Sequence, residues 1–289
     1  MTTPTVGIAL GGGGARGLAH IPVLEVLDEF GIVPTVVAGT SIGALIGSGY
    51  AAGMSGREIR AYAEEVFADS GAVLSRIWDQ RPKKISELMA GMSGLSLQLN
   101  APGIVDMFLP EAVPATFEEL KIPLIAVASD YYGWQEAALS TGLLRPAIAA
   151  SIAIPVLFKP VSVDRRVMID GGAVNPLPID QIRTRADITI GVDVVGGPKA
   201  PGNPIPKAAE VVFGASQLMM QTITREKLSH SAPDILITPN IAVFRVLDFF
   251  KIRAILRASE PVKDELRRKL DTTLKGGLPP PDRPAALPL

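Results

Sequence analysis

Residues 5–43 read TVGIALGGGGARGLAHIPVLEVLDEFGIVPTVVAGTSIG, and this stretch decides the fold class. Thr5–Leu10 has the apolar, β-branched composition of a short buried strand, and a helical pattern over Leu18–Phe30 follows a run of glycines. Thr35–Ala38 predicts a second strand and Ile42–Ala52 a second helix. Strand, helix, strand and helix within about fifty residues are typical of a parallel α/β sheet.

The rest of the chain continues this alternation. Further strands are predicted at 123–129, 135–140, 156–163, 166–169, 187–195 and 234–238, and helices at 56–67 (with Ser55 as N-cap), 207–229 and much of 243–274. Residues 71–114 mix short helical pieces with Gly, Pro, Met and Ser, and we interpret them as an insertion or cap over the sheet. We expect one domain over 1–275 and a Pro-rich, disordered tail over 276–289.

Composition sets the outer limits on function. The chain has 289 residues, a formal net charge of −1 and no cysteine, which excludes disulfides, thiolate metal sites and a cysteine nucleophile. A nearly neutral chain without a basic stripe argues against a nucleic-acid partner. The N-terminus lacks the pattern of a secretory signal, and no stretch is long enough to span a bilayer. A soluble, cytoplasmic protein is the expectation, with peripheral membrane contact left open.

A glycine-rich loop, Gly12–Gly17, follows the first strand and formally matches the dinucleotide fingerprint G-x-G-x-x-G. That fingerprint also needs an acidic residue at the end of the second strand, and residues 38–43 (AGTSIG) contain no carboxylate. Consecutive glycines also let backbone N–H groups converge on a developing oxyanion, where each can contribute about 3 kcal/mol. A tight turn that packs a helix against a strand is the common structural alternative.

A second motif, Gly39–Gly43 (GTSIG), matches the nucleophile elbow G-x-S-x-G between a strand and a helix. The elbow is a sharp turn, so a Cβ at Gly39 or Gly43 would clash with neighbouring elements. Ser41 would begin the following helix, whose dipole favours an incipient alkoxide. The motif therefore predicts Ser41 as a nucleophile.

The two histidines of the chain are candidates for the base. His20 lies inside the first predicted helix, where a packing role is the better interpretation, and His230 ends a long helix. The order Ser41, Asp170, His230 is that of an α/β-hydrolase triad, but the serine of that fold follows a later strand. This triad is kept as an alternative.

Three aspartates are the other candidates. Asp170 follows an apolar strand and precedes two glycines, Asp130 also ends a strand, and Asp193 interrupts one. Position alone therefore leaves the choice open. An ordinary aspartate, with a pKa of about 3.9, is a weak base for a serine hydroxyl, so the site would have to desolvate it.

Together these motifs resemble the patatin-like phospholipases, in particular their small bacterial members. Gly12–Gly17 is similar to the oxyanion motif of that family, Gly39–Gly43 to its nucleophile elbow, and Asp170–Gly172 to the motif that carries its catalytic aspartate. Ala150–Pro155 is similar to its Ala-Ser-x-x-x-Pro block, and Ala128–Asp130 to another recurrent segment. The five segments occur in the order of the family.

The resemblance implies a three-layer α/β sandwich with a mostly parallel central sheet, helices on both faces and a helical insertion. It also implies a serine acyl hydrolase that cleaves fatty-acyl esters of lipids through a dyad of Ser41 and Asp170, without a metal or a cofactor. The further expected roles are oxyanion donors at Gly12, Gly13, Gly14 and Ile42, and loop support at Arg16 and Gly17.

Alternatives from other classes stay open. A non-catalytic module could use the same fold with its apolar cleft as a site for a ligand or a partner. Val243–Leu256 combines an apolar face with three cations, as interfacial helices do, although a helix packed on the core is the more frequent arrangement. The cations are Arg245, Lys251 and Arg253. Met89, Met92 and Leu95 fit either the lining of an acyl pocket or the packing of the core, and core packing is the more frequent arrangement.

Overall fold

The structure, a computed structural model, describes residues 4–68, 71, 98–197, 205 and 208–276. The strands in these residues are β1 (Val6–Leu10), β2 (Val36–Thr40), β3 (Leu124–Asp130), β4 (Gln135–Leu139), β5 (Val161–Val163), β6 (Arg166–Asp170), β7 (Ile188–Val192) and β8 (Ile235–Ile237). They form one sheet with the order β5-β6-β3-β2-β1-β7-β8, and β4 also pairs with β3. The run from β3 through β2, β1 and β7 to β8 is parallel, and the remaining pairs are antiparallel. The predicted mostly parallel sheet is confirmed.

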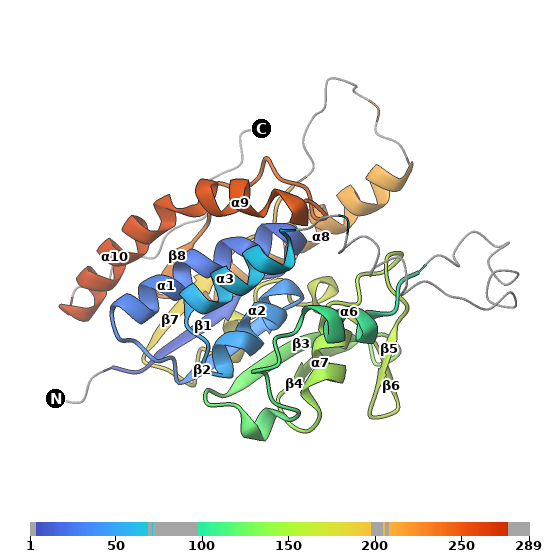
Figure 1. The fold of residues 1–289 in the computed structure, drawn as a ribbon, viewed down its shortest axis with the longest axis horizontal. Helices are drawn as coiled ribbons and strands as arrows, with labels where there is room; N and C mark the ends of the chain where they lie inside the picture. The colour runs from blue at the N-terminus through green and yellow to red at the C-terminus, as the bar shows by residue number, and fades with distance from the viewer. Residues whose placement is uncertain (1–3, 69–70, 72–97, 198–204, 206–207, 277–289) are drawn as a thin grey trace, which may run out of the picture.

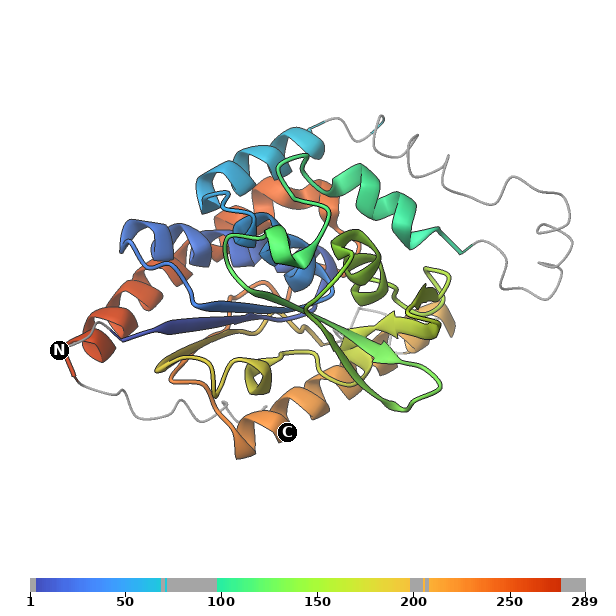
Figure 2. The same ribbon diagram turned by 90° about the horizontal axis from the view of Figure 1, so that it is seen from below.

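Helices cover both faces of the sheet (Figures 1 and 2). They are α1 (His20–Glu29), α2 (Ile42–Ala51), α3 (Gly56–Val66), α6 (Ala101–Phe108), α7 (Leu144–Ser151), α8 (Ala208–His230), α9 (Ile252–Ser259) and α10 (Pro261–Leu274). Short 3-10 turns are η1 (Gly14–Ala19), η3 (Phe117–Glu119), η4 (Gly171–Ala173), η5 (Ile179–Gln181) and η6 (Phe249–Lys251). In Figure 2 α8 lies below the sheet, and α1, α2 and α3 lie above it. The predicted three-layer arrangement is confirmed.

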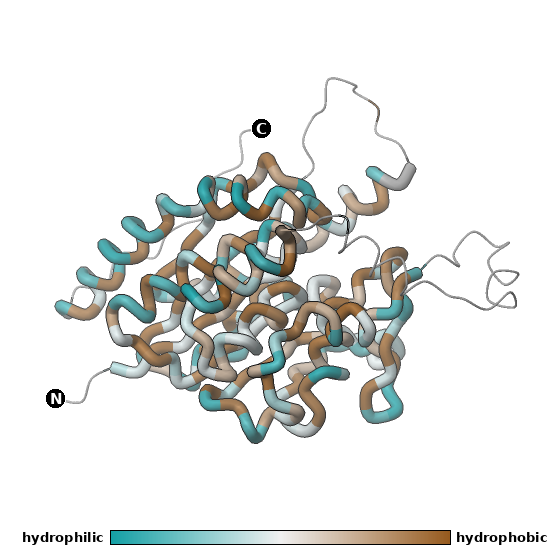
Figure 3. Tube along the Cα trace, in the orientation of Figure 1, coloured by the Kyte–Doolittle hydropathy of each residue, from teal (hydrophilic) through white to brown (hydrophobic). Residues whose placement is uncertain are grey.

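The core lies on both sides of the sheet. Ile8 and Leu10 of β1 belong to the cluster that includes α1 and α2, whereas Ala9 belongs to the cluster on the other side, with Leu228 of α8. Because successive side chains of a strand point to opposite faces, a strand covered on both faces must be apolar throughout. Figure 3 shows this segregation, with hydrophobic segments at the centre and hydrophilic turns along the outside of α10.

Most predicted elements occur near their predicted positions, and α3 begins as expected. Ser55 caps it through a reciprocal pair of hydrogen bonds with Glu58. The strand predicted at 156–163 is shorter, because only Val161–Val163 is extended in the sheet. Val156 has a φ of 74°, in the left-handed region, and this conformation is incompatible with a continuous strand.

The predicted helix over much of 243–274 is wrong for its first part. Residues 243–248 form turns, and regular helix begins with α9 at Ile252. The break between α9 and α10 falls at Pro261, which lacks the N–H of a helix interior and suits the first turn of a new helix. Ile252, Ile255 and Leu256 of α9 are buried, so this part does pack on the core.

Two predicted segments fall largely outside the described residues. Of the insertion at 71–114, the structure describes residues 71 and 98–114, which include α6, and Met89, Met92 and Leu95 lie outside. The predicted tail also lies outside, apart from Gly276. None of the helices in the described part of the chain has the length and apolar character needed to cross a membrane.

The pairing of β3 brings the ends of β2 and β6 together. Ala126 pairs with both β2 and β4, so these two strands lie on opposite edges of β3. Ala128 pairs with both β4 and β6, so β6 shares an edge with β2. On that edge β2 ends with Thr40 opposite Val127, and β6 ends with Asp170 opposite the next residue. The carboxyl ends of β2 and β6 therefore meet.

Candidate active site

Ser41 occupies a sharp turn between β2 and α2. Its φ of 55° and ψ of −122° lie in a sparsely populated region, which costs about 1–3 kcal/mol. The flanking glycines make the turn sterically feasible: a Cβ at Gly39 would lie 2.5 Å from the amide nitrogen of Ala44, and one at Gly43 would overlap the carbonyl of Leu10. This is the geometry that the G-x-S-x-G pattern predicts.

The hydroxyl of Ser41 contacts Asp170 directly. Ser41 Oγ donates a hydrogen bond to Asp170 Oδ2 at 2.6 Å, and the two residues are only 4% and 6% exposed. Burial raises the pKa of Asp170 from 3.8 to about 6, against the opposing effect of hydrogen bonds from Ser41 and from the N–H of Gly172. A carboxylate with such a pKa, in contact with a hydroxyl, can accept its proton near neutral pH.

Three hydrogen bonds fix Asp170 in place. The N–H of Gly172 donates to Oδ1 at 2.7 Å, which leaves Oδ2 for Ser41. On the backbone, Asp170 N–H donates to the carbonyl of Ala153, and Ser129 Oγ donates to the carbonyl of Asp170 at 2.8 Å. Asp130, the neighbour of Ser129, instead accepts from the N–H of its own turn, at Gly133.

Ser151 holds the turn at Ser41 in place, a role that was not predicted from the sequence. Its Oγ accepts a hydrogen bond from the N–H of Ser41 at 2.9 Å and donates one to the carbonyl of Val127 at 2.6 Å. Ser151 is fully buried at the end of α7. The hydroxyl therefore ties the strained turn to β3. The Ala150–Pro155 block was the signal that could have indicated this role.

The glycine loop lies beside the turn, but its members differ in what their N–H groups do. The N–H of Gly12 donates to the carbonyl of Pro176 at 2.8 Å, so the expectation that Gly12 is an oxyanion donor is wrong. Gly14 and Ile42 begin η1 and α2, and the first N–H groups of a helix have no acceptor within it. Both residues line the same cavity as Ser41.

Close packing explains the glycines of the loop. A Cβ at Gly13 would lie 2.5 Å from the carbonyl oxygen of Val194, and Gly14 has a φ of 59° and packs on the backbone of Val246. A Cβ at Gly17 would overlap the side chain of Ile42. The loop is thus held between the segment that follows β7, α2 and the segment that precedes α9.

Arg16 is buried within this loop, with 2% of its surface exposed. Burial lowers the pKa of its guanidinium to about 10, which the nearby charge of Asp193 partly offsets. Burial also raises the pKa of Asp193 to about 6, and the N–H of Val195 donates to its carboxylate. The side chain of Arg16 packs directly over Gly196. These contacts connect the glycine loop to the segment after β7.

Neither histidine contacts Ser41. His20 is fully buried, and its Nε2–H donates to the carbonyl of Gly11 at 2.8 Å. Burial lowers its pKa to about 4, so the ring is neutral near pH 7 and braces the start of the glycine loop. The His230 side chain is 75% exposed, and its ring bonds to Glu226 at the end of α8. The Ser41–Asp170–His230 arrangement is not formed.

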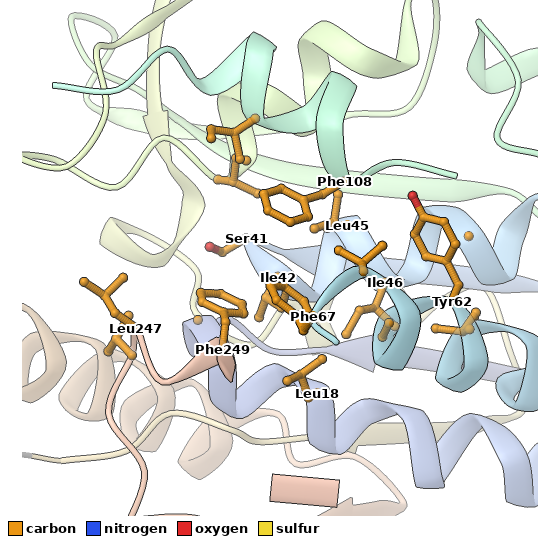
Figure 4. Close-up of a pocket in the computed structure, with 18 of the residues that line it drawn as sticks. Leu18, Ser41, Ile42, Leu45, Ile46, Tyr62, Phe67, Phe108, Leu247 and Phe249 are labelled. Atoms are coloured by element: carbon orange, nitrogen blue, oxygen red, sulfur yellow. The ribbon is translucent and has the colours of Figure 1, made fainter. Parts of the chain in front are cut away.

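A cavity of about 370 Å³ opens beside Ser41. Its walls come from η1, α1, α2, α3, α6, residues 152–158 and the loop at 246–250. Among the described residues that line it, only Ser41 and Tyr62 bring side-chain hydroxyls. Figure 4 shows Ser41 at one end of α2, with Leu45 and Ile46 further along the helix. Gly49 also lines the cavity and lies about 12 Å along α2 from Ser41. An apolar chain attached at Ser41 could extend through this space.

The arrangement is an α/β fold with a serine and a buried carboxylate in contact beside an apolar cavity. Among the described residues, no group of three or more His, Cys, Asp or Glu side chains could hold a metal ion. The profile of the family described as patatin-like phospholipase matches residues 8–183. The chain belongs to this family.

Relatives by sequence agree with this assignment. An NTE family protein of Mycobacterium tuberculosis, itself uncharacterized, is 36% identical over 201 residues, which cover 69% of this chain and 52% of that protein. Patatin-like phospholipase domain-containing protein 7 of Rattus norvegicus is 29% identical over 197 residues, 67% of this chain and 14% of that protein. The chain thus spans about half the length of the mycobacterial relative and a much smaller share of the rat protein.

The crystal structure of VipD from Legionella pneumophila shares the fold. It superposes with a TM-score of 0.50 over 94% of this chain and 67% of that chain, at 15% sequence identity. At this identity the likeness concerns the fold alone. It therefore supports the architecture independently of the motifs.

Proposed function

We propose that the chain is a serine acyl hydrolase that cleaves fatty-acyl esters of lipids or phospholipids, with Ser41 as nucleophile and Asp170 as base. The observation that carries the proposal is the 2.6 Å contact between the two side chains beside an apolar cavity. A hydroxyl and a base in contact are the requirement for nucleophilic catalysis, and the cavity has the chemistry to bind an acyl chain.

The first step forms an acyl-enzyme. Asp170 accepts the proton of Ser41 as Oγ bonds to the ester carbonyl carbon, and the carbonyl oxygen becomes an oxyanion. The N–H groups of Gly13, Gly14 and Ile42 are the proposed donors to that oxyanion. The tetrahedral intermediate then collapses, the bond to the alcohol breaks, and Asp170 returns the proton to the departing alcohol oxygen.

The second step releases the fatty acid. Asp170 accepts a proton from water, whose oxygen attacks the acyl carbon, and the proton returns to Ser41 Oγ as the acyl–oxygen bond breaks. Arg16 and Gly17 act on this chemistry through the shape of the loop. His20 acts in the same indirect way, because its ring holds the carbonyl of Gly11.

Covalent labelling with a fluorophosphonate tests the proposal without a choice of substrate, since such probes react with activated serines. We expect one adduct, mapped to Ser41 by peptide mass, that is lost in Ser41→Ala and in Asp170→Ala. Asp130→Asn is the matched control, because this carboxylate was also a candidate by sequence and instead accepts a hydrogen bond from Gly133 N–H; it should still label.

The other outcomes have definite meanings. Labelling that survives in Asp170→Ala but is lost in His230→Ala would contradict the dyad. If the folded protein takes no label at all, the result would favour a non-catalytic module whose cavity binds an apolar ligand.

A further inference from the structure

The cavity opens through a loop that also faces solvent. We call residues 243–251 the mouth loop. Leu247 and Phe250 of this loop line the cavity and are nevertheless 52% and 41% exposed, so they stand where the cavity meets the surface. Val243 of the same loop is 63% exposed. Figure 4 shows Leu247 and Phe249 entering the cavity wall from this loop, on the side of Ser41.

The exposed charges at the mouth loop are cationic. Arg245 and Lys251 of the loop are exposed, and so is Arg253 in the first turn of α9. The one acidic residue of the loop, Asp248, has only 17% of its side chain exposed, and it accepts hydrogen bonds from the N–H of Arg245 and from the Lys251 ammonium. An apolar surface bordered by cations is the composition of protein surfaces that bind anionic lipid.

A second exposed apolar surface lies on α8. Val211, Val212, Leu218 and Met219 are each about half exposed, and residues 211–222 contain no charged residue. This helix passes close to the dyad, because Met220 packs against Gly172. In Figures 1 and 2 its N-terminal half lies at the end of the molecule opposite the chain's N-terminus.

A third exposed apolar group is aromatic. The turn between β3 and β4 carries Tyr131, Tyr132 and Trp134, which are 55%, 74% and 91% exposed. Tyrosine and tryptophan favour the interface between water and lipid, because their rings are apolar and carry one polar group. In Figure 2 this hairpin projects at the same end of the molecule as the N-terminal half of α8.

The mouth loop and the aromatic turn share one end of the molecule for a topological reason. β1, β2, β3 and β7 are parallel, so their carboxyl ends share an edge of the sheet. The glycine loop, Ser41 and the aromatic turn follow three of those ends, and the mouth loop packs on the glycine loop through Ala15 N–H and the carbonyl of Val246. The mouth loop and the aromatic turn thus lie at the same end of the sheet as Ser41, although they are far apart in the sequence.

We propose that this end of the molecule docks on an anionic lipid surface, so that an acyl chain can enter the cavity from that surface through the mouth loop. The inference rests on the proposed function, because it assigns the source of the substrate. A lipid surface fits better than a second copy of the chain. A second copy seated on the mouth loop would close the opening to Ser41, whereas a lipid surface supplies what the cavity binds.

Vesicle co-sedimentation of the Ser41→Ala full chain tests docking apart from catalysis. Vesicles of phosphatidylcholine alone are compared with vesicles in which roughly a third is phosphatidylglycerol. We expect binding to the anionic vesicles, and about tenfold weaker binding for Val243→Glu and for Tyr132→Glu. Val33→Glu is the matched control: Val33 is 72% exposed, but it precedes β2 and so lies at the opposite edge of the sheet.

The results separate docking from the proposed function. When Ser41 is retained, Val243→Glu and Tyr132→Glu should hydrolyse a soluble short-chain ester at the wild-type rate while losing activity on anionic vesicles. Equal vesicle binding by Val243→Glu and Val33→Glu would overturn the docking proposal. So would a stable dimer, seen by light scattering, that Val243→Glu dissociates. Loss of soluble-ester hydrolysis in Ser41→Ala alone bears on the catalytic proposal and not on docking.

Discussion

Replacing Asp170 by asparagine should abolish turnover and stabilise the fold at pH 8. The carboxyl is 6% exposed, and burial raises its pKa from 3.8 to about 6. Because the folded state holds the proton more tightly than the unfolded state, this group's contribution to stability is fully present below pH 3.8 and is lost as the pH rises through 6. A shift of about 2 pKa units corresponds to a loss of about 3 kcal/mol at pH 8.

Asparagine removes this loss with little change in shape. Its side-chain oxygen can still accept the hydrogen bond from Gly172 N–H, and its amide can donate to the Ser41 hydroxyl. The Tm of Asp170→Asn, followed by circular dichroism, should therefore exceed that of the wild type by roughly 5 °C at pH 8. At pH 4 the folded wild-type carboxyl is already neutral, and the difference should nearly vanish.

Two results would refute this reasoning. An equal gain in Tm at pH 8 and at pH 4 would mean that the buried charge is not its cause. Hydrolysis of a soluble ester by Asp170→Asn at near the wild-type rate would remove Asp170 from its role as the base. The first result concerns the electrostatics of the site and the second its chemistry, so the two can fail separately.

Three further predictions follow from the same geometry. In a stopped-flow pH series with a soluble ester, the logarithm of kcat/KM should fall below pH 6 with a slope of one, because Asp170 takes up one proton. Ser151→Ala should lower the unfolding free energy in urea by about 2 kcal/mol, because the N–H of Ser41 and the carbonyl of Val127 lose their buried partner. Gly49→Leu should lower the ratio of long-chain to short-chain ester turnover at least about tenfold by filling the far part of the cavity.

Local sequence patterns were sufficient to predict the sharp turn at Ser41. Gly39 and Gly43 are required by close approaches to Ala44 and Leu10, which lie within the first two strand–helix units. A turn of this kind depends on steric limits that neighbouring residues impose, and those limits are visible in the sequence. The early strands and helices, whose apolar periodicity is strong, were predictable for the same reason.

The partner of Ser41 depended on long-range pairing instead. Asp130, Asp170 and Asp193 all lie at or near strand ends, and periodicity does not distinguish them. Asp170 meets Ser41 because β2 and β6 lie end to end on one edge of β3, and that register is a property of the assembled sheet. Only the family resemblance selected Asp170 in advance. The acceptor of Gly12 N–H, the carbonyl of Pro176, was hidden for the same reason.

The mouth loop was mispredicted as helix because its composition is that of an amphipathic helix whereas its conformation is not. Residues 243–256 have the apolar and cationic mixture of an amphipathic helix, yet only Ile252 and the residues after it are in α9. The backbone of Val246 is engaged by Ala15 N–H, a contact with the glycine loop that a regular helix would not offer. Tertiary contact thus replaced local helical preference.

The direct contact between serine and carboxylate has a physical consequence for the whole site. An Oγ–Oδ2 distance of 2.6 Å leaves no room for an imidazole between the two side chains, so the proposed mechanism requires the carboxylate itself to take the proton. Exclusion of water raises its pKa to about 6, and exclusion of water is also what makes the neighbouring cavity suitable for an acyl chain. Basicity and apolar binding therefore have one cause. A substitution that admits water beside Asp170 would weaken both together.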